Sequence, residues 1–394
     1  MTITIVGSGF GGVKTALLLA KNKKNKITLI TNNPDFQYYP ALYGTATGYS
    51  HLQAWVALDV IFKNISNVTI VIDTITKIDK TSKQLAGESG LKYDYHTLVL
   101  ALGAVTTYFG IEGIDHYAYG VKSADEIKKL KDHLYTEFAK ERELDKHYVV
   151  VGGGPTGVEL SAALVTYLDN LRTHYKLTRQ KIRINLVEAA PRVLPRMSES
   201  ASRKVEARLK KLGINVETGK AVQSETADTL MVSGEPIKSH TVIWTSGVAN
   251  NPFYAANPDA FSLAKNGKVV VDDYLRADKD IYVIGDNAAT AYSGLAQTAL
   301  RDAHFVAHAI KDFQHGVTPR VYTAKMPPVV IPVGENWAIF EWKFIKLSGW
   351  IASLIRSAAD FVGYSDILPF GHALGVWRSQ RVKDATYYGP TDTK

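Results

Sequence analysis

The 394-residue sequence contains no cysteine. Without a thiol the chain can form no disulfide, no thiolate metal site and no redox-active dithiol, which excludes enzymes that pass electrons through paired cysteines. No stretch reaches the roughly 18 uninterrupted apolar residues that a membrane-spanning helix needs. Met1 and Thr2 run straight into apolar residues, without the basic and apolar regions of a secretory signal, which predicts a cytoplasmic protein.

Positive charge is in modest excess, because the sequence has 46 Lys and Arg residues but only 38 Asp and Glu residues, which gives a net charge of +8. Such a balance favours anionic ligands, nucleic acid or an anionic membrane surface. No nucleic-acid-binding motif accompanies it, and the longest basic cluster is Lys21 to Lys26, so we expect no nucleic-acid partner. The 11 histidines show no metal-ligand spacing, so we expect no metal.

A glycine motif of the form G-x-G-x-x-G is present twice, at residues 7–12 and 152–157. Each copy follows a β-branched run and opens an apolar helix, which is the context of a dinucleotide-binding turn. Its first glycine makes the tight turn, the second lets the backbone approach a pyrophosphate, and the third lets the helix close on the sheet. Two Rossmann-like units with two nucleotides are therefore predicted, the alternative being glycine-rich turns without a ligand.

The two motifs differ in the residue that ends the following strand, where an acid usually binds the ribose hydroxyls. In the second unit this residue is Glu188, which favours NADH because a carboxylate repels a 2′-phosphate; nearby Arg192 is interpreted as a surface arginine. In the first unit Thr31 takes this position, so Thr31 or Asn32 must bind the ribose, or Asp35 must reach back.

Strand and helix patterns alternate along most of the chain, as in a parallel α/β sheet. They predict a first domain at residues 1–115 that resumes at 250–325, a second domain inserted at 116–249, and a C-terminal region at 326–394. A capping box from Ser123 to Glu126 begins a helix over 123–140. Asp286 follows a strand over 280–284, directly before an alanine-rich helix, and is either a ligand of a flavin ribityl chain or a helix N-cap.

The C-terminal region is rich in tryptophan, since four of the six lie after residue 336. Between Phe344 and Val362, apolar residues recur at helical spacing, while Lys346, Arg356 and Asp360 are among the polar residues of the other side. This pattern predicts an amphipathic helix that lies in a membrane interface. The alternatives are a helix packed on the body of the protein and one packed on a second subunit.

The order of these motifs, with Ala101-Leu102-Gly103, Thr245-Ser246-Gly247 and Gly285-Asp286, resembles the flavoprotein superfamily that has two dinucleotide-binding domains. Within it the chain is similar to type II NADH dehydrogenases, the single-subunit, non-proton-pumping NADH:quinone oxidoreductases. The stretches that carry this likeness are residues 39–43, 46–48, 93–99, 108–110, 157–160, 242–248 and 296–299.

The resemblance implies FAD in the first domain and NADH in the second. It places Gly103 beside the flavin, Asp286 on its ribityl chain, and Ala296 and Gln297 beside the isoalloxazine where the quinone arrives. The expected FAD-binding residues are thus Gly7, Gly9, Gly12, Thr31, Asn32, Gly103, Asp286, Ala296 and Gln297, and the expected NADH-binding residues are Gly152, Gly154, Thr156, Gly157, Glu159, Glu188 and Gly247.

The expected catalytic residues are Glu159, Gln297 and Arg301. Glu159 matches a glutamate that in the family lies near the nicotinamide and links the two substrate sites, although from the residues alone it could simply favour the helix dipole. Arg301 is a departure, because the family often has a second glutamine there. A cation at this position could orient a quinone carbonyl or stabilise a reduced quinol anion.

These features predict a peripheral enzyme at the cytoplasmic face of the membrane, which passes hydride from NADH to FAD and two electrons to a membrane quinone, with a homodimer compatible. Sulfide:quinone oxidoreductases and dithiol reductases share the architecture but need cysteines. Two alternatives stay open: a soluble reductase of a ferredoxin or rubredoxin, and a flavoprotein whose NADH-bound state recruits a partner.

Overall fold

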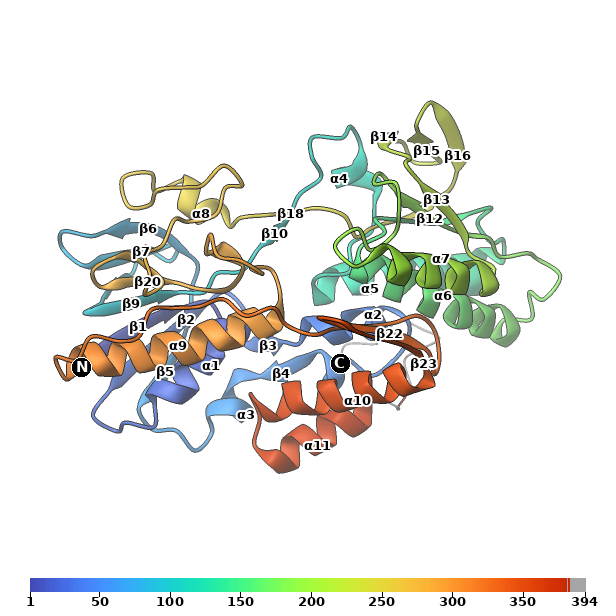
Figure 1. Cartoon of the computed structure of the whole chain (residues 1–394). Coiled ribbons are helices and arrows are strands. Elements are labelled where there is room, and N and C mark those ends of the chain that lie inside the picture. Colours follow the sequence, from blue (N-terminus) through green and yellow to red (C-terminus); the bar gives the residue numbers. More distant parts are fainter. Residues whose placement is uncertain (381, 383–394) are drawn as a thin grey trace.

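The protein has two lobes that lie side by side, with the C-terminal elements along one side of both (Figure 1). The computed structural model describes residues 1–380 and 382. Each lobe is built on a parallel sheet, so the α/β class expected from the sequence is confirmed.

The sheet of the first lobe has six strands, and two distant parts of the chain build it. Their order across the sheet is β19 (Arg276–Asp278), β20 (Ile281–Val283), β9 (Thr97–Leu100), β1 (Thr2–Val6), β2 (Lys26–Thr31) and β5 (Val68–Ile72). All neighbours are parallel except β19 and β20. Strand β20 thus extends along β9, although some 180 residues of sequence lie between them.

Both faces of this sheet are covered, which explains why its strands are apolar without alternation. Ile5, Leu29 and Val99 pack into the core beneath α1 (Phe10–Leu19) and α9 (Ala296–Gln314), which lie side by side (Figure 1). Val6 and Leu98 face a second cluster on the opposite side. That side carries a three-stranded sheet and a short helix: β6 (Ile75–Asp79), β7 (Gln84–Gly87), β8 (Lys92–Asp94) and α8 (Pro252–Ala255).

The second lobe has a four-stranded parallel sheet in the order β13 (Asn215–Thr218), β12 (Ile184–Glu188), β11 (Tyr148–Val151) and β17 (Thr241–Trp244). Helices α5 (Ala124–Tyr135), α6 (Pro155–His174) and α7 (Glu199–Lys211) pack around it, and α5 continues as the π-helix η3 (Thr136–Glu141). The predicted capping box is confirmed, since Ser123 accepts from the Glu126 N–H and the Glu126 carboxylate accepts from that of Ser123. A small sheet of β14 (Val222–Glu225), β15 (Thr229–Val232) and β16 (Glu235–Lys238) lies nearby, with α4 (Ile114–Tyr117).

The chain passes between the lobes along a two-stranded antiparallel ribbon of β10 (Val105–Thr106) and β18 (Val248–Ala249), visible between them in Figure 1. The second sheet is therefore inserted in the sequence between strands of the first. Short elements follow β2 in the first lobe: β3 (Asp35–Gln37), η1 (Tyr39–Ala41), α2 (Leu42–Ala46), η2 (His51–Gln53), β4 (Trp55–Ala57) and α3 (Leu58–Phe62).

The C-terminal elements are an antiparallel sheet of β21 (Val329–Pro332), β22 (Ala338–Trp342) and β23 (Ile345–Gly349), then α10 (Trp350–Ser365) and α11 (Phe370–Ser379). The helix expected from Phe344 onward begins only at Trp350, because residues 345–349 pair with β22 instead. In the described part of the chain, no helix is both long enough and apolar enough to cross a bilayer.

Candidate functional site

The first glycine motif forms the turn between β1 and α1. Gly7 has φ +106°, and a Cβ there would lie 2.2 Å from the carbonyl oxygen of Ala101 at the end of β9. A Cβ on Gly12 would lie 1.8 Å from the oxygen of Gly7. Both positions therefore exclude any side chain, as the first and third glycines of a dinucleotide-binding turn require.

The second motif repeats this geometry between β11 and α6. Gly152 has φ +114° and lies against Ser246, whose Oγ would be 2.4 Å from a Cβ, and a Cβ on Gly157 would be 1.8 Å from the oxygen of Gly152. Thr156 lies in the first turn of α6. Each parallel sheet thus ends in the same turn at the carboxyl edge of its strands, where ligands bind in open α/β sheets.

The middle glycines indicate what this turn accommodates. Gly9 (φ −74°, ψ −173°) and Gly154 (φ −71°, ψ −177°) have extended backbones that any residue can adopt. No heavy atom lies within 4 Å of a Cβ built on either. Neither backbone nor packing requires glycine here, so close approach by a ligand is the remaining reason. Neither helix start has a side-chain cap, which leaves its first N–H groups to a phosphate.

The predicted ribose ligand of the second unit lies against its glycine turn. Glu188 accepts hydrogen bonds from the backbone N–H groups of Gly153 (2.5 Å) and Ala190 (2.7 Å), and it is partly exposed. These bonds hold the carboxylate beside the glycine turn. Arg192 instead donates to the carbonyls of Pro195 (2.7 Å) and Met197 (2.9 Å), so its guanidinium is held by the backbone.

Thr31 occupies the equivalent place in the first unit but is nearly buried. Its hydroxyl is 2.8 Å from that of Ser8 in the glycine turn and accepts from the Asn33 N–H at 3.2 Å. Asn32 is exposed, and Asp35 is the first residue of β3. The threonine therefore ties β2 to the turn, and Asn32 is the more accessible of the two predicted ribose ligands.

Asp286, Gly103 and Asn287 lie together at the carboxyl edge of the first sheet. Asp286 is in the short helix η4 (Gly285–Asn287), and burial raises its carboxyl pKa against the opposing effect of Lys268. Asn287 donates to the Gly103 carbonyl (2.8 Å) and to Asn250 (2.6 Å). Its own buried Oδ1 has no partner among the described residues, and Gly103 has open space around it, so these groups fit a bound cofactor.

The prediction of an alanine-rich helix directly after Asp286 is wrong, and so is the alternative that Asp286 is the N-cap of that helix. Helix α9 begins only at Ala296, with Leu295 as its N-cap, and a loop containing Gly294 (φ +101°) separates it from η4. The helix is still anchored there, because Asp302 accepts from the Gly285 N–H at 3.0 Å.

Gln297 lies in the first turn of α9, and Arg301 lies one turn later. The Arg301 guanidinium donates to the carbonyl of Lys325 at 2.7 Å, so it is attached to the segment that follows the helix. Gly247 lies at the crossing between the lobes, where a Cβ would lie 2.6 Å from the Thr107 oxygen, and Lys122 donates to its carbonyl at 3.2 Å.

Glu159 is buried in α6 and forms an ion pair with a residue of the C-terminal region. Its Oε1 lies 3.0 Å from Nη1 of Arg356 in α10, whose Nε lies 2.9 Å from the Asp360 carboxylate. The same guanidinium donates to the Pro40 carbonyl at 2.7 Å, and Tyr38 donates to Asp360 at 3.1 Å. This network, which we call the Arg356 network, joins both lobes to α10.

Burial raises the pKa of Glu159 to about 7; Arg356 opposes this shift, and Asp360 adds to it. A carboxyl with such a pKa exchanges protons near neutral pH. Sequence reasoning missed Arg356, which it placed only on the polar side of an amphipathic helix. The i,i+4 spacing of Arg356 and Asp360 was the one local signal, and their inward orientation depends on partners far away in sequence.

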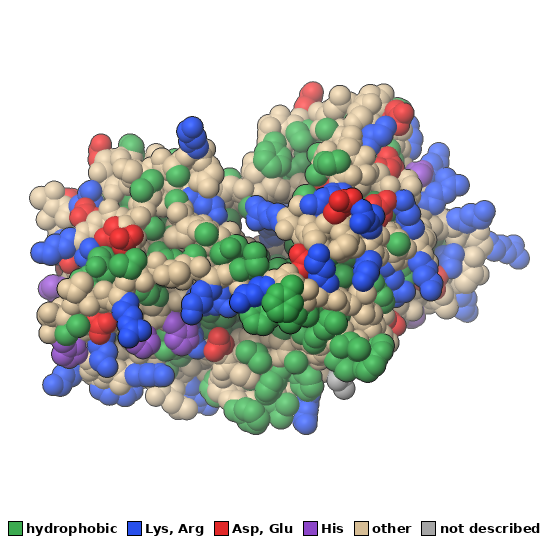
Figure 2. Space-filling model, viewed as in Figure 1, with side chains coloured by type: hydrophobic (Ala, Val, Ile, Leu, Met, Phe, Trp, Pro, Cys, Tyr) green, Lys and Arg blue, Asp and Glu red, His purple; other side chains and the backbone are tan. Residues whose placement is uncertain are grey.

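Figure 2 shows the molecule hollowed between the two lobes, and the two glycine turns belong to opposite sides of this division. The apolar side of α10, by contrast, faces outward. Large apolar residues are exposed on and beside it, namely Phe344, Trp350, Ile351, Leu354, Val362 and Phe370, and we call them the apolar face. Among residues 1–380 and 382, no group of three or more His, Asp or Glu side chains could hold a metal ion.

Comparison with known proteins matches residues 1–303 to the pyridine nucleotide-disulphide oxidoreductase family. A type II NADH:quinone oxidoreductase of Mycobacterium tuberculosis is 30% identical over 384 residues, covering 90% of this chain and 82% of that protein. One from Staphylococcus epidermidis is 28% identical, covering 91% and 94%. The solved structure of NDH2 from Plasmodium falciparum in complex with NADH shares the fold, with a TM-score of 0.86 at 20% identity over 96% of this chain and 97% of that one.

Proposed function

This chain belongs to the pyridine nucleotide-disulphide oxidoreductase family and, within it, to the type II NADH:quinone oxidoreductases, and we propose that it catalyses electron transfer from NADH through FAD to a membrane quinone. The observation that carries the proposal is the repeated glycine turn, with Gly9 and Gly154 each open to a ligand. Two such turns can bind two dinucleotides, and an NADH-dependent flavoenzyme needs two, FAD and NADH.

We assign FAD to the first lobe. The start of α1 would hold its pyrophosphate at Gly7, Gly9 and Gly12, and Asp286 with Gly103 would hold its ribityl chain and ring. Bound there, FAD would accept hydride from NADH and pass two electrons to a quinone. The chain itself supplies alignment, since correct orientation of two reactants is worth much of the barrier.

We assign NADH to the second lobe. The start of α6, from Gly152 to Gly157, would hold its pyrophosphate, Glu188 would accept from the ribose hydroxyls, and Gly247 would border the site. A carboxylate already fixed by two backbone N–H groups would repel the extra phosphate of NADPH.

The quinone would reach the flavin beside Ala296 and Gln297. Glu159, with its pKa near neutrality, is a source or acceptor of protons for the reduced quinone, and Arg356 holds its carboxylate in place. Arg301 borders this region, although its bond to Lys325 makes it a positioning residue for the neighbouring segment.

We further propose that the apolar face attaches the protein to the cytoplasmic side of the membrane as a peripheral protein. Six large apolar side chains gathered on one surface are an interaction site, and tryptophan and phenylalanine suit the interfacial region of a bilayer (Figure 2). The inward polar side of α10 supports this orientation, because Arg356 and Asp360 face the body of the protein while Leu354 and Val362 stay exposed.

The catalytic proposal is tested by stopped-flow spectroscopy of the purified flavoprotein with NADH, followed by turnover with a short-chain quinone and with ferricyanide. We expect rapid flavin reduction, quinone turnover, and a kcat/KM for NADH at least 10-fold above that for NADPH. Flavin reduction without quinone turnover would contradict the quinone assignment and favour a protein acceptor or partner recruitment.

Membrane attachment is tested by sedimentation with anionic vesicles. Replacing Leu354 and Val362 by serine should release the protein, whereas the same changes at Val317 and Val321, which are exposed outside the apolar face, should not. If the wild-type protein stays in solution and elutes as a dimer, the face binds a second copy instead.

A further inference from the structure

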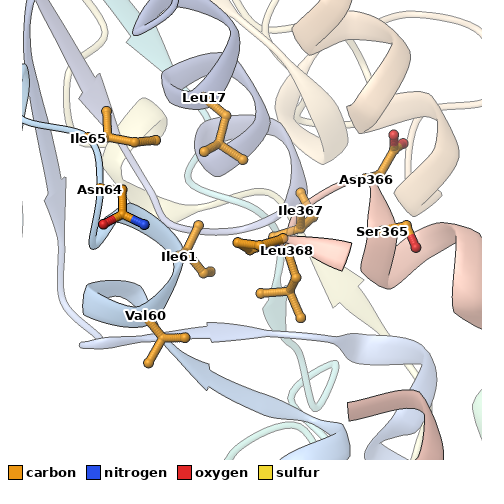
Figure 3. A pocket seen from close by; sticks show the side chains of 10 residues that line it. Leu17, Val60, Ile61, Asn64, Ile65, Ser365, Asp366, Ile367 and Leu368 are labelled. Carbon is orange, nitrogen blue, oxygen red and sulfur yellow. The ribbon is translucent and has the colours of Figure 1, made fainter. Parts of the chain in front are cut away.

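A cavity of about 270 Å³ lies away from the residues assigned to the two dinucleotides and the quinone. Helices α1 and α3 form one wall, and the turn between α10 and α11 forms the other (Figure 3). Its apolar lining comes from Leu17, Val60, Ile61, Ile65, Ile367 and Leu368. Figure 3 shows Leu17, Ile61 and Leu368 directed toward one another across the space.

The second wall is fixed rather than loosely packed. Lys14 in α1 donates to the carbonyl oxygen of Asp366 at 2.7 Å and to its carboxylate at 3.1 Å. Lys14 itself is buried, so this attachment holds the turn of residues 365–369 beside α1. Ser365 and Pro369 of the same turn are exposed, which places the mouth of the cavity at the surface.

The mouth lies next to Phe370, one residue of the apolar face. The turn that lines the cavity joins α10 to α11, and exposed Phe370 follows it directly. An apolar chain that extends from a membrane against the apolar face would therefore meet the opening. The volume lies just below the range of about 300–1,000 Å³ that is typical of sites for drug-sized molecules, so the space has room for a segment of an apolar chain.

Basic side chains lie near Asp366 of this turn, and burial lowers the pKa of His304, so its imidazole is uncharged near neutral pH. His304 in α9 lies within electrostatic range of Lys14, Asp366, His308 and Lys21. Asp366 is already paired with Lys14, whereas Lys21, His304 and His308 are exposed, and Lys21 has no ion pair with any residue of the described chain. Figure 2 shows lysine and histidine side chains gathered beside the apolar surface.

We propose that this cavity binds a segment of one acyl chain of an anionic phospholipid, whose phosphate lies on Lys21 and accepts hydrogen bonds from the imidazoles of His304 and His308. The apolar lining selects the chain, and the charge of Lys21 selects an anionic headgroup. The inference rests on the membrane attachment proposed above, because the lipid enters from the bilayer.

The test uses the full-length flavoprotein in mild detergent and native mass spectrometry, with dioleoyl phosphatidylglycerol or dioleoyl phosphatidylcholine as the probe. We expect one retained phosphatidylglycerol, and at least 10-fold weaker retention after Val60→Trp, which fills the cavity. Val317→Trp makes the same exchange on the exposed surface and should retain the lipid. Lys21→Gln with His308→Gln should weaken retention of phosphatidylglycerol only.

Flavin absorbance and the urea midpoint check that each variant folds, and Ile65→Phe replaces Val60→Trp if the latter loses FAD. Unchanged lipid retention in the filled variant would overturn the proposal, as would equal retention of phosphatidylcholine by the wild type. A raised KM for a long-chain quinone with normal lipid retention would assign the cavity to the quinone tail instead. Failure of membrane attachment is seen separately, as wild-type protein that does not sediment with vesicles.

Discussion

Replacing Arg356 by methionine should destabilise the protein strongly. Methionine keeps much of the aliphatic volume but removes the cation between Glu159 and Asp360, whose side chains, like that of Arg356, are about one-tenth exposed (10%, 10% and 11%). The substitution also removes the donors to the carbonyls of Pro40 (2.7 Å) and Val330 (3.3 Å).

The expected loss follows from what is left behind. Removing one partner of a buried ion pair typically costs about 3–5 kcal/mol, because the other charge stays buried without compensation. Here two carboxylates lose their cation, so we expect a loss of about 4 kcal/mol in the free energy of unfolding at pH 8. Urea denaturation followed by flavin fluorescence measures it.

The loss should depend on pH in a defined direction. Burial already raises the pKa of Glu159 to about 7, and without Arg356 this pKa rises further, so acidification protonates the stranded Glu159 carboxylate. The deficit of Arg356→Met should therefore shrink from pH 8 to pH 5. In a double-mutant cycle with Glu159→Gln, the coupling energy should be about 1–3 kcal/mol. A deficit below about 1 kcal/mol that is the same at both pH values would refute the reasoning.

Three further predictions concern single positions. Gly9→Ala should lower FAD retention, and Gly154→Ala should raise the KM for NADH at least 10-fold. Neither change should lower the stability of the protein, because neither new Cβ meets a protein atom, and a loss of stability would contradict the prediction. Gly375→Ala in α11, which is equally open, is the control. Glu188→Ser should raise kcat/KM for NADPH relative to NADH, and an unchanged ratio would remove Glu188 from the ribose site. Burial raises the pKa of Glu225 to about 8, so its contribution to stability is full below its ordinary pKa and lost as the pH rises through 8. Glu225→Gln should remove that part of the pH dependence, and stability curves of the wild type and the variant that run parallel from pH 5 to 9 would contradict it.

Sequence reasoning succeeded where the cause of a structure is local. The glycine turns and the capping box of Ser123 and Glu126 depend on residues within a few positions of one another, and both were identified correctly. The position of Glu188 at the end of its strand was also identified correctly, although Gly153, which it contacts, lies 35 residues earlier in the sequence.

Sequence reasoning failed where residues far away in the sequence determine the local structure. Apolar spacing predicted a helix from Phe344, but pairing with β22 makes residues 345–349 a strand, since an available strand edge outweighs weak local preference. Alanines after Asp286 predicted an immediate helix, yet the chain first needs the loop through Gly294. Arg356 was invisible as a site residue because Glu159 and Pro40 are far away in sequence.

The split origin of the six-stranded sheet has a consequence for synthesis on the ribosome. Strand β9 ends at Leu100, but its neighbour β20 begins only at Ile281. At about 5–20 residues per second, the edge of β9 waits roughly 10–40 s for its partner, while the complete second sheet can already form. The nascent chain thus exposes an apolar strand edge for this interval, which makes it a natural client for a chaperone until residue 283 emerges.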